Sequence, residues 1–150
     1  MAKKIKANTS IKKDDGNKYS LSDIEAKLLG VHKNDDKAFV ILKHFDSSYQ
    51  CFSEWTGNEL RDFSNFIDTI NQMTWSEIYR SGGKSNKTGL GYTVHTNKEV
   101  LPNPRLLETI SEDITFFELR VSKKARVHGF RVKSAFYLVW LDRGHEVYPM

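Results

Sequence analysis

The sequence of 150 residues contains one cysteine, Cys51, and only three prolines. A lone cysteine excludes an intramolecular disulfide framework and a cysteine-based zinc cluster. No apolar run approaches the ~20 residues that a transmembrane helix needs. No apolar stretch or small-residue cleavage site follows the basic N-terminus, so we do not expect a secretory signal. With 39% hydrophobic and 28% charged side chains, the chain is predicted to be a cytoplasmic globular protein with no membrane partner.

The net charge of the chain is concentrated at its N-terminus. Residues 1–18 hold six lysines and two aspartates (6 − 2 = +4), which equals the formal net charge of the whole chain. Because this segment has two isoleucines and no aromatic residue, it cannot bury enough apolar surface to fold. We therefore predict a flexible basic arm over residues 1–18 and a single domain over residues 19–150. The arm could attract a polyanion, although mixed surface charge also serves solubility.

Hydrophobic periodicity predicts an α+β domain that ends in an antiparallel meander. The expected elements, in chain order, are a helix at 22–30, a strand at 38–45, one amphipathic helix from 57 to 80, a Gly- and Lys-rich loop at 81–97, a short helix at 104–110, and strands at 115–122, 126–132 and 135–141. The apolar stripe of the long helix covers about five turns. The last strand is apolar on both faces, which is typical of a central strand.

Two familiar functional motifs are absent. The run Gly83-Lys84-Ser85 is not a phosphate-binding loop, because that motif needs a glycine where Ile78 stands and a strand before it. The five histidines contain no pair at metal-ligand spacing, which favours neither a metal site nor a cofactor. We expect His32, His44 and His95 to be ordinary, partly exposed residues.

The predicted meander gathers charged and aromatic side chains at one side of a small sheet. By period-two alternation this group consists of Glu118, Arg120, Arg126, His128 and Phe130, joined by Asp142, Arg143, His145 and Tyr148 from the end of the last strand. Metal-free cleavage of RNA needs a base for the 2′-hydroxyl, an acid for the leaving 5′-oxygen, cations for the phosphate and an aromatic platform. The group contains each of these. Arg and Glu on neighbouring strands also form routine structural pairs, so that alternative stays open.

The stretch Ala125–Pro149, ARVHGFRVKSAFYLVWLDRGHEVYP, resembles the final two strands of the RelE/YoeB/YafQ-type ribosome-associated endoribonuclease toxins. In those proteins an arginine opens the penultimate strand, and a histidine with a nearby tyrosine or phenylalanine closes the last one. Arg126 matches the first position, and His145 with Tyr148 matches the second. The stretch also resembles uncharacterised prophage and bacterial proteins that end in the same motif.

The resemblance implies a RelE-like fold and a metal-independent endoribonuclease of a toxin–antitoxin or prophage system, without a cofactor. The implied partners are RNA or the ribosome, and an antitoxin or host protein. We expect His145 to act as general acid or base and Arg126 to stabilise the phosphate. Glu118 is the candidate second acid or base, and Tyr148 is the candidate platform for a nucleobase. The candidate cations that steer RNA are Lys84, Lys87, Lys123, Lys124, Arg131 and Arg143.

A rival interpretation is a non-catalytic phage or mobile-element protein that binds a host protein or nucleic acid. Residues 1–18 and 81–97 would then form the binding surfaces and become ordered on the partner. A small-molecule enzyme is disfavoured, because the sequence carries no cofactor motif.

Overall fold

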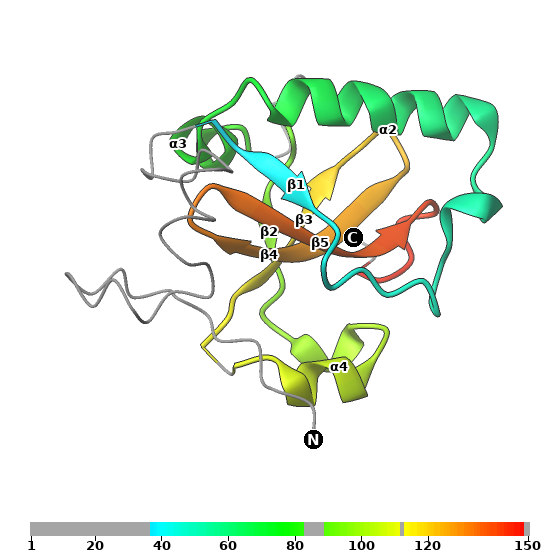
Figure 1. The fold of residues 1–150 in the computed structure, drawn as a ribbon, viewed down its shortest axis with the longest axis vertical. Helices are drawn as coiled ribbons and strands as arrows, with labels where there is room; N and C mark the ends of the chain where they lie inside the picture. The colour runs from blue at the N-terminus through cyan, green and yellow to red at the C-terminus, as the bar shows by residue number, and fades with distance from the viewer. Residues whose placement is uncertain (1–36, 83–88, 112, 149–150) are drawn as a thin grey trace.

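The described part of the chain forms a five-stranded mixed sheet with helices on both faces (Figure 1). The structure is a computed structural model that describes residues 37–82, 89–111 and 113–148. The strand order is β1-β5-β4-β3-β2, so the expected α+β class is confirmed. The arm predicted at 1–18 and the helix predicted at 22–30 lie outside the described residues.

The C-terminal half of the described chain is the predicted antiparallel meander. It consists of β3 (Phe116–Arg120), β4 (Arg126–Val132) and β5 (Ala135–Asp142). Every residue of β5 is buried, as expected of a strand that lies between two others. The predictions of its central position and of both hairpins are confirmed.

Two short strands complete the sheet at its edges. The first, β1 (Phe39–Ile41), pairs in parallel with β5. It is shorter than the strand predicted at 38–45, because the chain turns after Ile41, with Phe45 N–H donating to Leu42 O. The second, β2 (Thr93–Val94), pairs with β3 in antiparallel orientation. The prediction of a continuous loop over 81–97 is therefore wrong at these two residues.

The long helix predicted from 57 to 80 is two helices, α2 (Gly57–Ile70) and α3 (Trp75–Arg80). The chain leaves the helix after Ile70 and starts again at Thr74, whose hydroxyl accepts a hydrogen bond from Glu77 N–H while the Glu77 carboxylate accepts from Thr74 N–H. This capping box satisfies amide groups that a continuous helix would use internally. The apolar spacing continues across the break, so periodicity alone could not reveal it.

The remaining helical segments are short. The predicted third helix is confirmed as α4 (Pro104–Thr109), where the Asn103 side chain accepts from the amides of Arg105 and Leu106. Single 3-10 turns form at η2 (Phe52–Glu54) and η3 (Lys98–Val100). No helix within the described ranges is long and apolar enough to cross a membrane.

Two apolar cores lie on opposite faces of the sheet. The first packs α2 and α3 against one face through residues such as Phe66, Trp75 and Phe117. The second packs the other face against the region of α4 through residues such as Phe116 and Trp140. Figure 1 shows α2 and α3 on one side of the strands and α4 on the other. The buried polar side chains of β3, β4 and β5 lie on the second face.

A bulge in β5 decides which face Asp142 occupies. Along β4 and β5, Gly129 pairs with Leu138, but His128 pairs with Trp140, so Val139 is an extra residue. The extra residue reverses the alternation, so that Trp140 joins the second core whereas Leu138 belongs to the first. Asp142, two residues further on, therefore shares the face of Trp140 and His128.

Candidate active site

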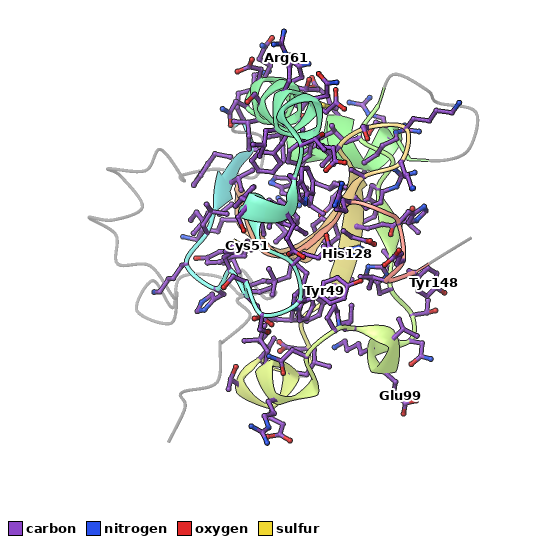
Figure 2. The ribbon with its side chains drawn as sticks, turned by 90° about the vertical axis from the view of Figure 1, so that its right-hand side faces the viewer. Tyr49, Cys51, Arg61, Glu99, His128 and Tyr148 are labelled. Carbon is purple, nitrogen blue, oxygen red and sulfur yellow. The ribbon has the colours of Figure 1, made fainter. Side chains whose placement is uncertain are left out.

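Neighbouring strands place four polar side chains at one end of the second face. Glu118 of β3 pairs with His128 of β4, and Arg126 of β4 pairs with Asp142 of β5. Glu118 and Asp142 are 2% and 0% exposed, and His128 is fully buried. Figure 2 shows His128 inside the molecule between α2 and α4, with Tyr148 at its edge. Charged groups at such depth need specific partners.

Three of the buried groups form a hydrogen-bonded chain. Nε2 of His128 lies 2.9 Å from Oδ2 of Asp142, and Nδ1 of His128 lies 2.8 Å from Nε2 of His95. Asp142 also accepts from the backbone N–H groups of Glu146 and Val147. As a carboxylate can only accept, Nε2 of His128 carries the proton. Nδ1 of His128 then accepts from His95, which leaves Nδ1 of His95 without a proton.

A second group of contacts surrounds Glu118. Its Oε1 lies 3.2 Å from Nε2 of His145 and 3.8 Å from Nε of Arg126. Its Oε2 lies 3.9 Å from Nδ1 of His128, and within the described chain it has no hydrogen-bond partner. The side chain of His145 is 18% exposed, whereas that of Glu118 is 2% exposed. His145 is thus the more accessible end of the pair.

The surroundings move the pKa values of these groups in different directions. Burial raises the pKa of Glu118 to about 7, with Arg126 opposing the rise and Asp142 adding to it. Burial, together with His128 and His145, lowers the pKa of His95 to about 4. Burial also lowers the pKa values of His128 and His145. The three histidines are therefore neutral near pH 7, while Glu118 is close to its midpoint.

Asp142 keeps its charge inside the protein. Burial acts to raise its pKa, but the hydrogen bonds from His128 and from the amides of Glu146 and Val147 bring the pKa below the usual value. Burial lowers the pKa of Arg126, and Glu118 opposes this change. The site consequently holds one permanent carboxylate and one guanidinium around a carboxyl group that can titrate.

The structure brings together three of the four residues that the sequence indicates as catalytic candidates, and places the fourth, Tyr148, beside His95. Glu118, Arg126 and His145 are in mutual contact through Oε1 of Glu118. The Tyr148 ring lies 5.1 Å from the ring of His95, measured between centroids. Of the convergence expected from the sequence, the structure therefore shows the contacts among Glu118, Arg126 and His145, whereas Arg143 lies against Glu59.

The candidate RNA-steering cations are spread more widely. Lys84 and Lys87 lie outside the described residues, and Lys123 and Lys124 are exposed in the turn between β3 and β4. The guanidinium of Arg131 lies over the Trp75 ring, 4.9 Å from its centroid, and donates to the Tyr79 hydroxyl. Arg143 donates to Glu59 at 2.8 Å. The side chains of both arginines are thus engaged in contacts within the protein.

His95 is the residue that the sequence argument misjudged. It was expected to be partly exposed, but it is 3% exposed and sits directly after β2, its N–H donating to Phe116 O. The short strand β2 carries it against β3. The alternation of Tyr92 and Val94 with Thr93 and His95 is a weak strand signal, but nothing in the spacing indicates that this histidine contacts His128.

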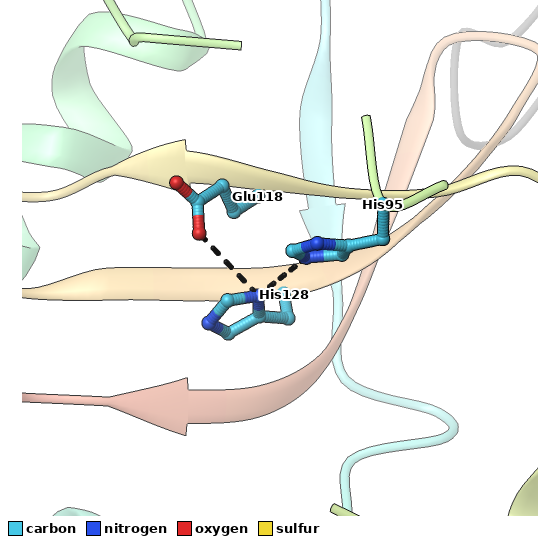
Figure 3. Close-up of side chains that lie close together, drawn as sticks. All are labelled: His95, Glu118 and His128. Carbon is cyan, nitrogen blue, oxygen red and sulfur yellow. Dashed lines mark hydrogen bonds and ion pairs between the residues drawn. The ribbon is translucent and has the colours of Figure 1, made fainter. Parts of the chain in front are cut away.

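His95, Glu118 and His128 also form a possible metal-ligand set. One ligand atom from each side chain lies within 4.8 Å of the others. Figure 3 shows the three side chains converging from β3, β4 and the residue after β2. The sequence suggested no metal ligands, because these residues are 23 and 10 positions apart and only the sheet pairing brings them together.

Comparison with known proteins identifies no relative. No family model, no curated protein and no solved structure matches the chain. The likeness to RelE-type toxins therefore depends on the residues of the C-terminal stretch alone.

Proposed function

We propose that the protein is a metal-independent endoribonuclease with His145 as its catalytic base. One observation carries the proposal: the Glu118 carboxylate contacts both the His145 imidazole, at 3.2 Å, and the Arg126 guanidinium, at 3.8 Å. Together they offer a titratable base, a carboxylate that orients it and a cation beside it. Transesterification of RNA requires such a base and a group that offsets the developing phosphate charge.

The difference in burial between Glu118 and His145 favours different roles for the two residues. Since Glu118 is almost fully buried and His145 is partly exposed, we assign direct contact with RNA to His145. Glu118 would act through His145 as a positioning residue, in place of the second acid or base expected from the sequence. With Glu118 ionised, Nε2 of His145 donates to it, and Nδ1 keeps the lone pair that can accept a proton.

In the proposed reaction Nδ1 of His145 takes the proton of a 2′-hydroxyl. The 2′-oxygen attacks the adjacent phosphorus, and the bond from phosphorus to the 5′-oxygen breaks. The leaving oxygen takes a proton from water, which gives a 2′,3′-cyclic phosphate and a 5′-hydroxyl. Arg126 would stabilise the extra negative charge on the phosphate, and Tyr148 would offer its ring to a nucleobase.

The backbone of His145 supports a functional role. Its φ angle is +56°, in the left-handed region, which costs a residue with a Cβ roughly 1–2 kcal/mol. Such conformations persist where surrounding contacts enforce them, and they are enriched at active sites. Here the Asp142 carboxylate fixes Glu146 and Val147, the two residues that follow His145, by accepting hydrogen bonds from their backbone N–H groups.

The test is cleavage of labelled RNA, both free and bound to ribosomes, in the presence of EDTA. We expect the wild-type protein to cleave at least one of these substrates and to leave the 2′-deoxy analogue intact. His145→Gln should reduce the rate by roughly 10²–10⁴-fold, the usual contribution of a general base. Arg126→Gln should also reduce the cleavage rate.

Matched controls separate catalysis from folding. His44→Gln changes a half-buried histidine that stacks on Tyr137, which is not one of the site residues, and should keep full activity. Near-UV circular dichroism of each variant should match the wild type. A wild-type protein inactive on both substrates, or a fully active H145Q variant, would reject the ribonuclease proposal.

A further inference from the structure

We propose that Nε2 of His95, Nδ1 of His128 and Oε2 of Glu118 bind one divalent transition-metal ion of the zinc class. The three side chains already present one ligand atom each within 4.8 Å of one another. Two imidazoles and one carboxylate form a recurrent zinc ligand set, which leaves a fourth position for water. Figure 3 shows the contacts from Glu118 and from His95 meeting at the ring of His128.

The distances between the ligand atoms suit an ion after small movements. Zinc binds nitrogen at about 2.0–2.1 Å, so ligand atoms in a tetrahedral site lie about 3.3 Å apart. The two histidine nitrogens are 2.8 Å apart, and Oε2 of Glu118 is 3.9 Å from Nδ1 of His128. These two separations differ from the ideal by about half an ångström, and the third, between His95 and Glu118, lies within 4.8 Å.

An outer partner already orients one of the proposed ligands. Oδ2 of Asp142 lies 2.9 Å from Nε2 of His128, so the proton stays on Nε2 and the lone pair of Nδ1 faces Nε2 of His95, the next proposed ligand atom, 2.8 Å away. A carboxylate behind a metal-bound histidine is the usual way in which proteins fix the tautomer and the ring orientation of that ligand. Binding through Nε2 of His95 places the proton of that ring on Nδ1.

The unpartnered oxygen of Glu118 is the observation that points to a ligand. Oε2 is buried and, among the described residues, has no hydrogen-bond partner, whereas Oε1 contacts His145 and Arg126. Buried polar atoms without partners are rare in folded proteins. The charges of Glu118 and Asp142 would together balance those of a divalent ion, with Arg126 as the cation nearby. The ion would lie behind the carboxylate, away from the exposed side of His145.

Zinc binding by purified, EDTA-treated protein tests this proposal, measured by titration calorimetry and by metal analysis after dialysis. We expect one zinc per chain. His95→Gln should weaken binding by at least about 100-fold because it removes a ligand, and Asp142→Asn should weaken it about 10–100-fold because it removes the orienting partner. His44→Gln, the matched control, should bind as the wild type does.

A second measurement guards against misfolded variants. Added zinc should raise the melting temperature of the wild type and of H44Q but not of H95Q, because only an intact site binds the folded state. Failure of the wild type to bind zinc, or equal binding by wild type and H95Q, would overturn the proposal. No RNA is used, so the result is independent of the ribonuclease assay.

Discussion

The proton between His95 and His128 is fixed by Asp142. The ionised carboxylate holds the proton of His128 on Nε2, so Nδ1 can only accept from His95. An added proton can bind Nδ1 of His95, which leaves the 2.8 Å contact in place but puts a positive charge in the interior. Glu118 behaves in the opposite way, since burial favours its neutral form. Lowering the pH therefore destabilises the folded state through His95 and stabilises it through Glu118.

Glu118→Gln should make the folded state more sensitive to acid. The pKa of His95 is about 4 in the fold and 6.5 in the unfolded chain, so the free energy of unfolding falls as the pH drops from 6.5 to 4. The pKa of Glu118 is about 7 in the fold and 4.5 when unfolded, so its contribution rises as the pH drops from 7 to 4.5. Without it, E118Q should lose about 2 kcal/mol more than the wild type between pH 6.5 and 4.5.

Urea unfolding at several pH values in this range measures both slopes. His95→Gln should show the reverse change, a shallower loss of stability than the wild type. Glu108→Gln removes an exposed carboxylate on α4 and should follow the wild-type curve. Parallel curves for E118Q and the wild type would contradict the assigned pKa directions.

At the scale of elements, the pairing of β4 with β5 determines whether the site can form. The bulge at Val139 moves Asp142 to the face that holds His128. Opposite the bulge stands Gly129, where the two strands approach closely. A Cβ built at this position would lie 1.9 Å from the carbonyl oxygen of Tyr137 and 3.0 Å from the Phe136 side chain. Only glycine allows this pairing.

Gly129→Ala should therefore destabilise the protein by about 3 kcal/mol, because the backbone of β5 must move to admit the methyl group. Gly57→Ala is the control, since a Cβ there meets nothing within 4 Å. That variant should be unchanged or up to about 1 kcal/mol more stable. Thermal and urea unfolding measure both effects. Equal stability of G129A and the wild type would show that the strands are not held in this register.

The sequence predicts regular elements well and irregular ones poorly. The alternation of apolar and polar residues predicted the meander and placed Glu118 and Arg126 on the faces that they occupy. It did so because successive residues of a strand point to opposite faces of the sheet. It could not reveal the break after Ile70, where the apolar spacing continues, or the bulge at Val139, which alters pairing without a composition signal. His95 was missed because a two-residue strand gives only a weak alternation signal.

At the scale of the whole molecule, one acidic side chain connects segments that are far apart in the chain. Oδ2 of Asp46, in the loop after β1, accepts from Nε1 of Trp140 in β5 at 3.0 Å and from the side chain of Asn103 at 3.1 Å. Asn103 in turn caps α4. The Asp46 amide donates to Val139 O, the extra residue of the bulge, at 2.9 Å. The loop, the helix and the bulge are thus held at one point.

Asp46→Ala should lower the free energy of unfolding by about 2 kcal/mol, because the fully buried Trp140 keeps an indole N–H without an acceptor. Asp68→Ala, which removes an exposed carboxylate from α2, should change it by less than about 0.5 kcal/mol. Hydrogen exchange should also accelerate at the amides of α4 in D46A, since Asn103 loses the partner that orients its cap. If D46A and D68A unfold alike and α4 exchanges at the wild-type rate, the loop does not hold the second face of the sheet together.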